Sequence, residues 1–464
     1  MPPLRPRRRV RDMEARIETF HPDSNDLPRQ LGLGSAAAAV AGEAIAVGIF
    51  LTPAGMAKAL GSPFWLLIVW LAVAATTLSG ALCFGELAGR FPRPGGSYVY
   101  LLETYGRRSA FLYGWMSLLV LDPGLTAALA TGIAAYASYI FHWSPLTQKL
   151  AAGLAIAAVA GMNIVSTRIS AGVLRWLTWL KFAVLGILTI WALAFHLGSW
   201  SNFVPFLAQR PGAMPLGPAL ATALVSAFFS FGGWWDATKI AGEVRDPGRT
   251  LPRALVLGVL AVTAVYIVIN AIFIYLVPIE KVGSDATFVA QAGAVLFGPP
   301  GAIIFAAIVI LCVTGSLAAF MISAPRVMYA MAKDGLFIRS VSQTHPRFGT
   351  PARAVAIQAA IACLLVVLGT FDQIVAYFMF PVIFFLGLTV SALFLLRRQP
   401  PQSENVVLTP GYPSTPVAFL ILILAMLALL TIHSPREAIL GSLVVLAGWP
   451  VYNWVIAQRP NEKS

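Results

Sequence analysis

Four ionisable side chains stand inside long apolar runs of this sequence, where charge is uncommon. They are Glu43, Asp122, Lys181 and Asp236. Charged groups in a bilayer are costly, and by default they mark binding sites, ion pathways or proton relays. A carboxylate in such a place could hold a proton or attract a cation. A lysine there could change its protonation state or act as a permanently charged pin between helices.

The composition indicates what kind of structure must position these groups. The chain has 464 residues, of which 58% are hydrophobic and 11% charged, and its mean hydropathy is +0.79. Charged residues are too scarce for a soluble protein of this length. Runs of about 20 apolar residues are long enough to cross a bilayer as helices, whereas membrane β-strands are about half as long. We therefore predict an all-α polytopic membrane protein.

Twelve apolar runs are predicted to be transmembrane helices. They cover about residues 33–60, 64–89, 109–140, 149–167, 173–197, 217–243, 253–278, 300–331, 352–371, 374–396, 415–433 and 437–457. Lys and Arg gather in the N-terminal arm and in alternate connections, so the positive-inside rule predicts that both termini are cytoplasmic. We expect a multi-pass protein of the plasma membrane, which in a bacterium is the inner membrane.

The basic N-terminal arm has two readings. Residues 1–30 are expected to be a flexible cytoplasmic tail that includes RPRRRVR. Such a run could bind nucleic acid, but on a membrane protein a basic arm more often sets orientation or touches anionic headgroups. Membrane lipids rather than nucleic acid are therefore the expected partner.

Glycines interrupt two of the predicted helices. The first run contains Gly42 and Gly48 followed by Pro53, and the sixth contains Gly232 and Gly233. Gly and Pro weaken helices, and an unpaired backbone group in lipid is costly unless protein, water or ligand satisfies it. Close helix packing is the simpler explanation for a single glycine pair. Two breaks five helices apart instead indicate a secondary transporter built from inverted repeats.

Several stretches resemble the APC superfamily of amino-acid, polyamine and organocation transporters, especially its L-type and cationic branches. They are VAGEAIAVGIFLTPAGMAKALGSP in the first run, GALCFGELAGRFPRPGGSYVYLLETYG at 80–106, FFSFGGWW at 228–235 and SAPRVMYAMAKDGLF at 323–337. The resemblance extends over about residues 30–400. Helices eleven and twelve resemble the family only in being apolar.

The resemblance implies a five-plus-five inverted-repeat (LeuT-like) fold with broken helices one and six. The two repeats would span about residues 31–197 and 217–398, which makes residues 31–398 the transport core. Residues 399–414 would be a linker, and residues 415–464 would hold helices eleven and twelve and a short cytoplasmic tail.

The resemblance also implies where substrate is held. The carboxylate of an amino acid would meet N–H groups of helix one, and its amine would meet carbonyl groups at both breaks, with Phe229 as an aromatic gate. The implied residues are Ala44, Ala46, Val47, Gly48 and Ile49 in helix one, and Phe229, Ser230, Gly232 and Gly233 in helix six. The family's glycine, small residue, glycine triplet is here Ala46, Val47 and Gly48, and the branched Val47 would narrow the pocket.

Lys181 falls in helix five, where sodium-independent members of the family carry a lysine. By the resemblance, its ammonium would occupy the place of a sodium ion and bridge carbonyls near Gly42 and Ile45 to Ser316 of helix eight. Both as a titrating group and as a fixed pin it argues against sodium coupling. Glu43 is less typical of the family. It could pair with Lys181, bind a proton or attract a cationic substrate.

Two readings of the substrate remain open at this stage. If Asp122 and Asp236 face the pocket, a cationic amino acid or a polyamine is favoured, because a buried cation needs a counter-charge. The apolar and aromatic sequence FSFGGWW favours neutral amino acids, and we take these as the first expectation. Exchange of one amino acid for another and proton-coupled uptake both fit.

Other classes of function find little support in the sequence. There is no cofactor, metal or catalytic motif, so we expect no enzyme, and a membrane receptor would not need matched broken helices. Cys83, Cys312 and Cys363 lie within apolar runs, where a free cysteine packs as a small hydrophobe. The loop FHWSPLTQ lacks the cysteine with which animal L-type relatives bind a heavy chain. We therefore expect a stand-alone, bacterial transporter.

Overall fold

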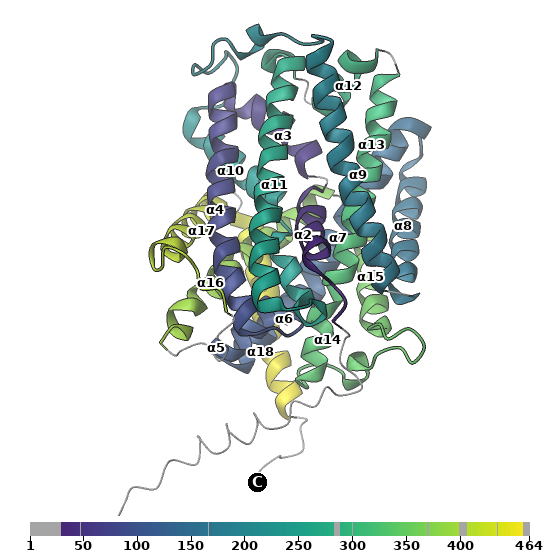
Figure 1. The fold of residues 1–464 in the computed structure, drawn as a ribbon, viewed down its shortest axis with the longest axis vertical. Coiled ribbons are helices and arrows are strands. Elements are labelled where there is room, and N and C mark those ends of the chain that lie inside the picture. The colour runs from purple at the N-terminus through teal and green to yellow at the C-terminus, as the bar shows by residue number, and fades with distance from the viewer. Residues whose placement is uncertain are drawn as a thin grey trace, which may run out of the picture.

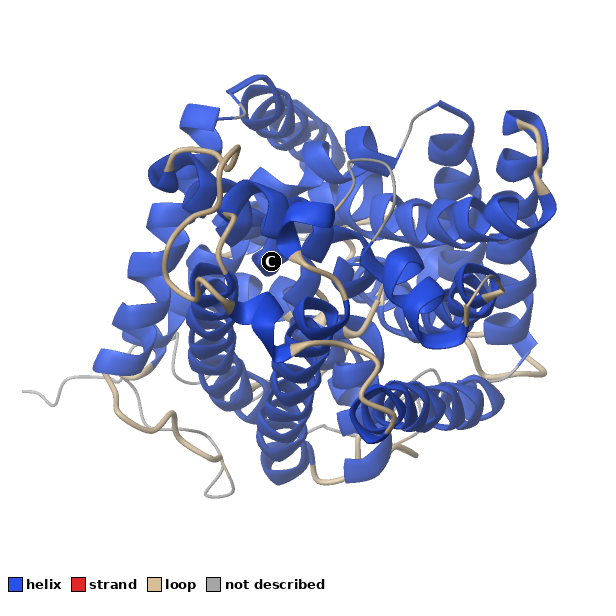
Figure 2. Ribbon diagram, turned by 90° about the horizontal axis from the view of Figure 1, so that it is seen from above, coloured by secondary structure: helices blue, strands red, loops and turns tan. Residues whose placement is uncertain are grey.

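A computed structural model describes residues 29–46, 48–165, 167–282, 288–298, 300–368, 371–398, 406–433 and 435–457. Long helices run roughly parallel to one axis and form a bundle (Figure 1). Seen from above, the bundle consists of helices joined by loops (Figure 2), and the described residues contain no strand beyond a single bridge between Leu31 and Val244. Ten of the described helices are long and apolar enough to cross a membrane. The prediction of an all-α polytopic membrane protein is confirmed.

The helices follow the predicted apolar runs closely. In chain order they are α2 (Leu33–Ala44), α3 (Gly48–Leu60), α4 (Pro63–Arg90), α6 (Arg107–Met116) continued by η1 (Ser117–Leu121) and α7 (Asp122–Phe141), α8 (Pro145–Val165), α9 (Thr167–Ala194), α10 (Leu216–Phe231) with η3 (Trp234–Glu243), α11 (Pro247–Leu276), α13 (Gly301–Ser323) with α14 (Pro325–Lys333), α15 (Ala352–Leu368), α16 (Phe371–Leu396), α17 (Ser414–His433) and α18 (Pro435–Ala457). α15 is apolar but shorter than the spanning helices. Two further helices, α5 (Ser97–Tyr105) and α12 (Phe288–Phe297), lie in connections for which no helix was predicted.

Local sequence explains several helix boundaries. Ser62 caps α4 by accepting a hydrogen bond from the Trp65 N–H, and Pro63 occupies the first turn, where its missing N–H does no harm. Pro123 also lacks an N–H, and the helix before it widens into the π-turn η1. Such turns are frequent at functional sites. Here the turn leads directly into Asp122.

The broken first helix lies in the middle of the bundle. α2 packs against α9, α11 and α13, while α3 packs against α10. α4 packs on α11 and α7 on α13, and α17 and α18 cover α4 and α6 on one side. α5 and α14 lie at the lower end of the bundle in Figure 1. This end, which we call the α5/α14 end, is the cytoplasmic one if the positive-inside prediction holds.

A buried carboxylate attaches the segment before α17 to the helical core. Glu86 of α4 is fully buried and accepts hydrogen bonds from Arg397 and from the Thr409 N–H, the latter at 2.8 Å. Arg90 also pairs with it at 3.0 Å. The described part of the expected linker is therefore held against α4. The division into repeats and linker stays a prediction.

Candidate functional site

The first break separates α2 from α3. α2 ends at Ala44, Ile45 leaves the helical region with φ −76° and ψ 73°, and α3 begins at Gly48. The Ala46 N–H is donated to the Ala44 carbonyl oxygen at 2.8 Å. Val47, one of the residues expected to meet a carboxylate, lies outside the described residues. Gly48 and Ile49 open α3, where N–H groups have no acceptor in their own helix.

The second break separates α10 from η3. Gly232 has φ −52° and ψ 153°, and Gly233 has φ 99°, a left-handed conformation that favours glycine. The two breaks touch. A Cβ on Gly233 would lie 3.1 Å from the Cβ of Glu43, and a Cβ on Gly48 would lie 2.7 Å from the Cα of Ser230. The glycines therefore allow both close packing and interruption of the helices.

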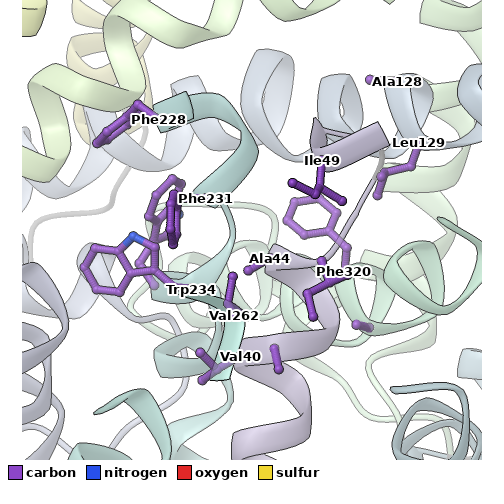
Figure 3. Close-up of a cluster of buried hydrophobic side chains, with 14 of the residues drawn as sticks. Val40, Ala44, Ile49, Ala128, Leu129, Phe228, Phe231, Trp234, Val262 and Phe320 are labelled. Atoms are coloured by element: carbon purple, nitrogen blue, oxygen red, sulfur yellow. The ribbon is translucent and has the colours of Figure 1, made fainter. Parts of the chain in front are cut away.

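A cavity lies between the breaks. Figure 3 shows buried apolar side chains beside the two breaks, with Phe228 and Phe231 to the left of Ala44 and Ile49. Its wall consists of Glu43, Ala44, Ala46, Gly48, Leu121, Leu125, Leu129, Phe228, Phe229, Ser230, Gly232, Gly233, Trp235, Phe320, Met379 and Val382. Most of the residues that the family resemblance implies for substrate binding are in this wall. Ile49 is not, and its side chain is fully buried.

Tyr266 of α11 joins the two breaks, and the sequence analysis did not identify it. Its hydroxyl lies 2.6 Å from the Ala44 carbonyl oxygen and 2.7 Å from the Ser230 carbonyl oxygen. These are two of the carbonyl groups expected to receive a substrate amine. One hydroxyl proton cannot satisfy both of them, and each carbonyl oxygen can accept a second hydrogen bond. Because the Ala44 oxygen also accepts from the Ala46 N–H, it keeps capacity for an ammonium group only when the Tyr266 proton is directed at the Ser230 oxygen.

Lys181 of α9 stabilises the end of α2. Its ammonium donates to the Gly42 carbonyl oxygen at 3.0 Å, the Ile45 carbonyl oxygen at 2.9 Å and the Ser316 hydroxyl at 2.7 Å. The last carbonyls of a helix have no partner in their own helix and carry partial negative charge. These are the partners that the resemblance implied. Among the described residues no ion pair joins Lys181 to Glu43, although the charge of Glu43 acts on the ammonium.

A second buried lysine, Lys239 of η3, was missed by the sequence analysis. Its ammonium lies 2.7 Å from a carboxylate oxygen of Asp122 and 2.7 Å from one of Asp236. All three side chains are at most 5% exposed. We call Asp122, Lys239 and Asp236 the charge cluster. Asp122 and Asp236 face Lys239 and are not part of the cavity wall.

The 3₁₀ geometry of η3 explains half of this cluster. Side chains three residues apart eclipse each other in a 3₁₀-helix, which brings Asp236 beside Lys239. The spacing of these two residues was therefore a usable signal. Asp122 is contributed by α7 from 117 positions away along the chain, and no local pattern pairs it with Lys239.

Glu43 supplies a charged side chain to the cavity wall. It is 5% exposed, and neither carboxylate oxygen has a hydrogen-bond partner among the described residues. It lies at the end of α2, next to Gly42 and Ala44, whose carbonyl oxygens are bound by Lys181 and Tyr266. The charges of Asp236, Lys239 and Asp122 act on the Glu43 carboxyl group.

The α5/α14 end of the bundle is closed below the cavity. The Gln30 and Leu31 N–H groups donate to the Glu243 carbonyl oxygen at 2.8 and 2.9 Å, and Arg326 of α14 binds the Glu243 side chain at 2.8 Å. Tyr98 donates to Asp334 at 2.9 Å. Burial and the adjacent Asp334 carboxylate raise the pKa of Tyr98, so its hydroxyl stays a donor.

The described part of the chain contains neither a candidate metal site nor a disulfide bond. No group of three or more His, Cys, Asp or Glu side chains there could hold a metal ion. Cys83, Cys312 and Cys363 are free thiols.

Comparisons with known proteins agree with the resemblance. A family described as "Amino acid permease" matches residues 31–456. The chain is 28% identical to the serine/threonine exchanger SteT of Bacillus subtilis over 439 residues, 93% of this chain and 98% of that protein. It is 30% identical to the b(0,+)-type amino acid transporter 1 of Oryctolagus cuniculus over 407 residues, 87% of this chain and 82% of that protein. It is 26% identical to the human cystine/glutamate transporter over 435 residues, 92% of this chain and 85% of that protein.

Proposed function

Because the chain belongs to the amino acid permease family, we propose that it is a sodium-independent transporter that carries neutral amino acids by alternating access. The observation that carries the proposal is the meeting of two helix breaks on one cavity. Helix breaks free backbone N–H and C=O groups, and a cavity between them offers these groups to a zwitterion. As a family member the chain is a multi-pass membrane transporter and not an enzyme. A bacterial inner membrane is the location we propose.

The cavity wall supports a neutral substrate. Apart from Glu43 it is mainly aliphatic and aromatic, which suits an uncharged side chain. The N–H groups of Gly48 and Ile49 would bind the carboxylate, and the carbonyl groups of Ala44 and Ser230 would bind the amine. Phe229 would close over the bound molecule. A cationic amino acid or a polyamine is the second candidate, favoured by the carboxylate of Glu43 in the wall.

The position of Lys181 supports independence from sodium. A sodium ion would need oxygen ligands, and the oxygens of Gly42, Ile45 and Ser316 already bind the lysine ammonium. The relatives include an exchanger by name. Exchange of one amino acid for another and proton-coupled uptake are both candidate modes of transport for this chain.

The test is uptake of radiolabelled amino acids into proteoliposomes of the purified protein. The panel includes neutral and cationic amino acids and a polyamine, with and without internal amino acid, and with sodium replaced by potassium. We expect saturable uptake of neutral amino acids that is unchanged without sodium. Uptake restricted to lysine, arginine or a polyamine would favour the second candidate, and uptake of no compound would refute the substrate class.

A pair of glycine variants tests the site itself. In Gly48→Ala the new Cβ would approach the Ser230 backbone at 2.7 Å, whereas in Gly55→Ala, also on α3, nothing lies within 4 Å. Overpacking of a tight contact costs about 1–3 kcal/mol, and 1.4 kcal/mol corresponds to a factor of about ten. We expect Gly48→Ala to lower substrate affinity about tenfold or more and Gly55→Ala to behave as wild type. Equal affinities for both variants would place the site elsewhere.

A further inference from the structure

We propose that Glu43 binds a proton while the α5/α14 end is closed and releases it when that end opens, so that substrate movement is linked to proton movement. The inference rests on the proposed transport function and adds the coupling ion. It concerns Glu43, an ionisable residue in the cavity wall, and the charge cluster that η3 forms with α7. Glu43, not Lys181, would carry the coupling proton.

The charges around Glu43 favour the protonated form of its carboxyl group. Asp122 and Asp236 share the single positive charge of Lys239, so the charge cluster already has an excess of negative charge. An ionised Glu43 would add another negative charge close to the charge cluster. An isolated ionised carboxylate in a low-dielectric site is strongly disfavoured, and such a group becomes neutral instead.

The surroundings of Glu43 offer no substitute for a proton. Neither of its oxygens has a hydrogen-bond donor among the described residues. The Ser323 hydroxyl of α13 is nearby but donates to the Phe320 carbonyl oxygen at 3.2 Å. Lys181 acts on Glu43 through its charge, but its hydrogen bonds go to Gly42, Ile45 and Ser316. Tyr266 of α11 donates to backbone carbonyls. In the closed state the carboxyl group is therefore the neutral acid.

The position of Glu43 explains how the proton would be released. The residue lies in the cavity wall and contacts Gly233 at the start of η3. Along η3, Gly233 is followed by Lys239 of the charge cluster and then by Glu243, which pairs with Arg326 of α14. If α2 and η3 separate at that end, water reaches the carboxyl group. The O–H bond of Glu43 then breaks, the proton passes to water, and the carboxylate becomes stable in its hydrated site.

The structure favours a proton over the cation of a substrate as the partner of Glu43. A cationic side chain would need several acceptors, and the rest of the cavity wall is mainly apolar. Asp122 and Asp236, which could have joined Glu43 in holding such a group, are engaged by Lys239. A substrate cation remains a distinct outcome of the experiment.

The first measurement needs no transport. Infrared spectra of the purified protein at neutral pH should contain the carbonyl stretch of a protonated carboxylic acid that is absent in Glu43→Gln. Glu103→Gln, which changes a surface carboxylate paired with Arg93, should leave the band unchanged. If Glu43→Gln has the same band as wild type, Glu43 is ionised and the proposal is wrong, whatever the transported compound is.

The second measurement follows protons during transport. Proteoliposomes carry a pH-sensitive dye inside, and transported amino acid is added outside. Wild type and Glu103→Gln should acidify the lumen as substrate enters, and a proton gradient should accelerate their uptake. In Glu43→Gln, the amino acid that enters should do so without lumen acidification and without dependence on the gradient, whatever its rate of entry.

The outcomes that overturn the proposal differ from failure of the proposed function. Substrate entry without acidification in wild type, or acidification that persists in Glu43→Gln, excludes Glu43 as the coupling site. Lysine or polyamine uptake without proton movement that is lost in Glu43→Gln would assign the carboxylate to a substrate cation. Absence of any uptake refutes the transport proposal alone, and the infrared result then still decides the state of Glu43.

Discussion

Two buried lysines, one on α9 and one on η3, belong to elements that both pack against α2, and they are stabilised in different ways. Lys181 binds two backbone carbonyl oxygens and a hydroxyl, and it forms no salt bridge with the part of the chain that the structure describes. Lys239 lies between two carboxylates. Both are essentially inaccessible to solvent. The same ammonium group is stabilised by oriented dipoles in one place and by full charges in the other.

The difference separates two roles that a charge can have in a broken helix. Partial charges at a helix end can stabilise a cation without requiring a second ionised group, so Lys181 can hold the break of α2 by itself. Lys239 instead depends on its carboxylates and they on it. Removing one member of such a group leaves an uncompensated buried charge. We expect Lys239 to matter most for folding and Lys181 most for transport.

The largest effect is expected from Lys239→Met. Two buried carboxylates would lose their counter-charge, and breaking a buried pair costs about 3–5 kcal/mol. Thermal unfolding in detergent, followed by loss of the monodisperse peak, measures the change. The triple variant Asp122→Asn, Lys239→Met and Asp236→Asn should recover much of the stability. If Lys239→Met alone is as stable as wild type, the contrast between the two lysines fails.

A smaller loss of stability, with a large loss of transport, is expected from Lys181→Met. The variant removes the ammonium from the carbonyl oxygens of Gly42 and Ile45. The Ser316 hydroxyl lies 2.8 Å from each of them but can donate to only one, so one carbonyl group is left unsatisfied, at a cost of about 1–3 kcal/mol. Amino-acid uptake per folded protein should fall about tenfold or more, the equivalent of 1.4 kcal/mol. Uptake at the wild-type rate would show that the break of α2 does not need the ammonium.

The double-mutant cycle of Asp122→Asn and Lys239→Met sharpens the comparison further. Residues in direct contact give interaction energies of about 0.5–3 kcal/mol, and a neighbouring cycle of Asp122→Asn with Lys181→Met should be additive within about 0.5 kcal/mol. Thermal or denaturant unfolding supplies all the values. Equal coupling of Asp122 to both lysines would mean that Lys181 and Lys239 are not stabilised independently of each other.

The smallest effect is expected from Ser316→Ala. Lys181 would keep both backbone acceptors and lose the hydroxyl at 2.7 Å, and a single hydrogen bond contributes about 0.5–1.5 kcal/mol. Uptake should fall severalfold while sodium independence is retained. Thr314→Ala is a suitable control, because the Thr314 hydroxyl bonds its own helix at Ile310.

The sequence predicted the helices better than it predicted the contacts between them. Apolar runs and glycine pairs placed the spans and both breaks, since these depend on local hydropathy and local backbone freedom. α5 was not predicted, because its nine residues SYVYLLETY are too short to register as a span. Tyr266 and Lys239 were missed because their partners come from distant helices. The partners of Lys181 were expected from the family resemblance, which carries long-range information that spacing lacks.

The attachment of Glu86 to Thr409 limits how far the chain can be shortened. The Thr409 amide and Arg397 both bind this fully buried carboxylate, and the Arg397 guanidinium also lies 4.1 Å from the Tyr412 ring centroid. A truncation directly after α16 would therefore remove Arg397 and the Thr409 amide as hydrogen-bond donors to Glu86, or expose its carboxylate to water. A shortened version without α17 and α18 should end beyond Tyr412, so that the segment after α16 still covers α4.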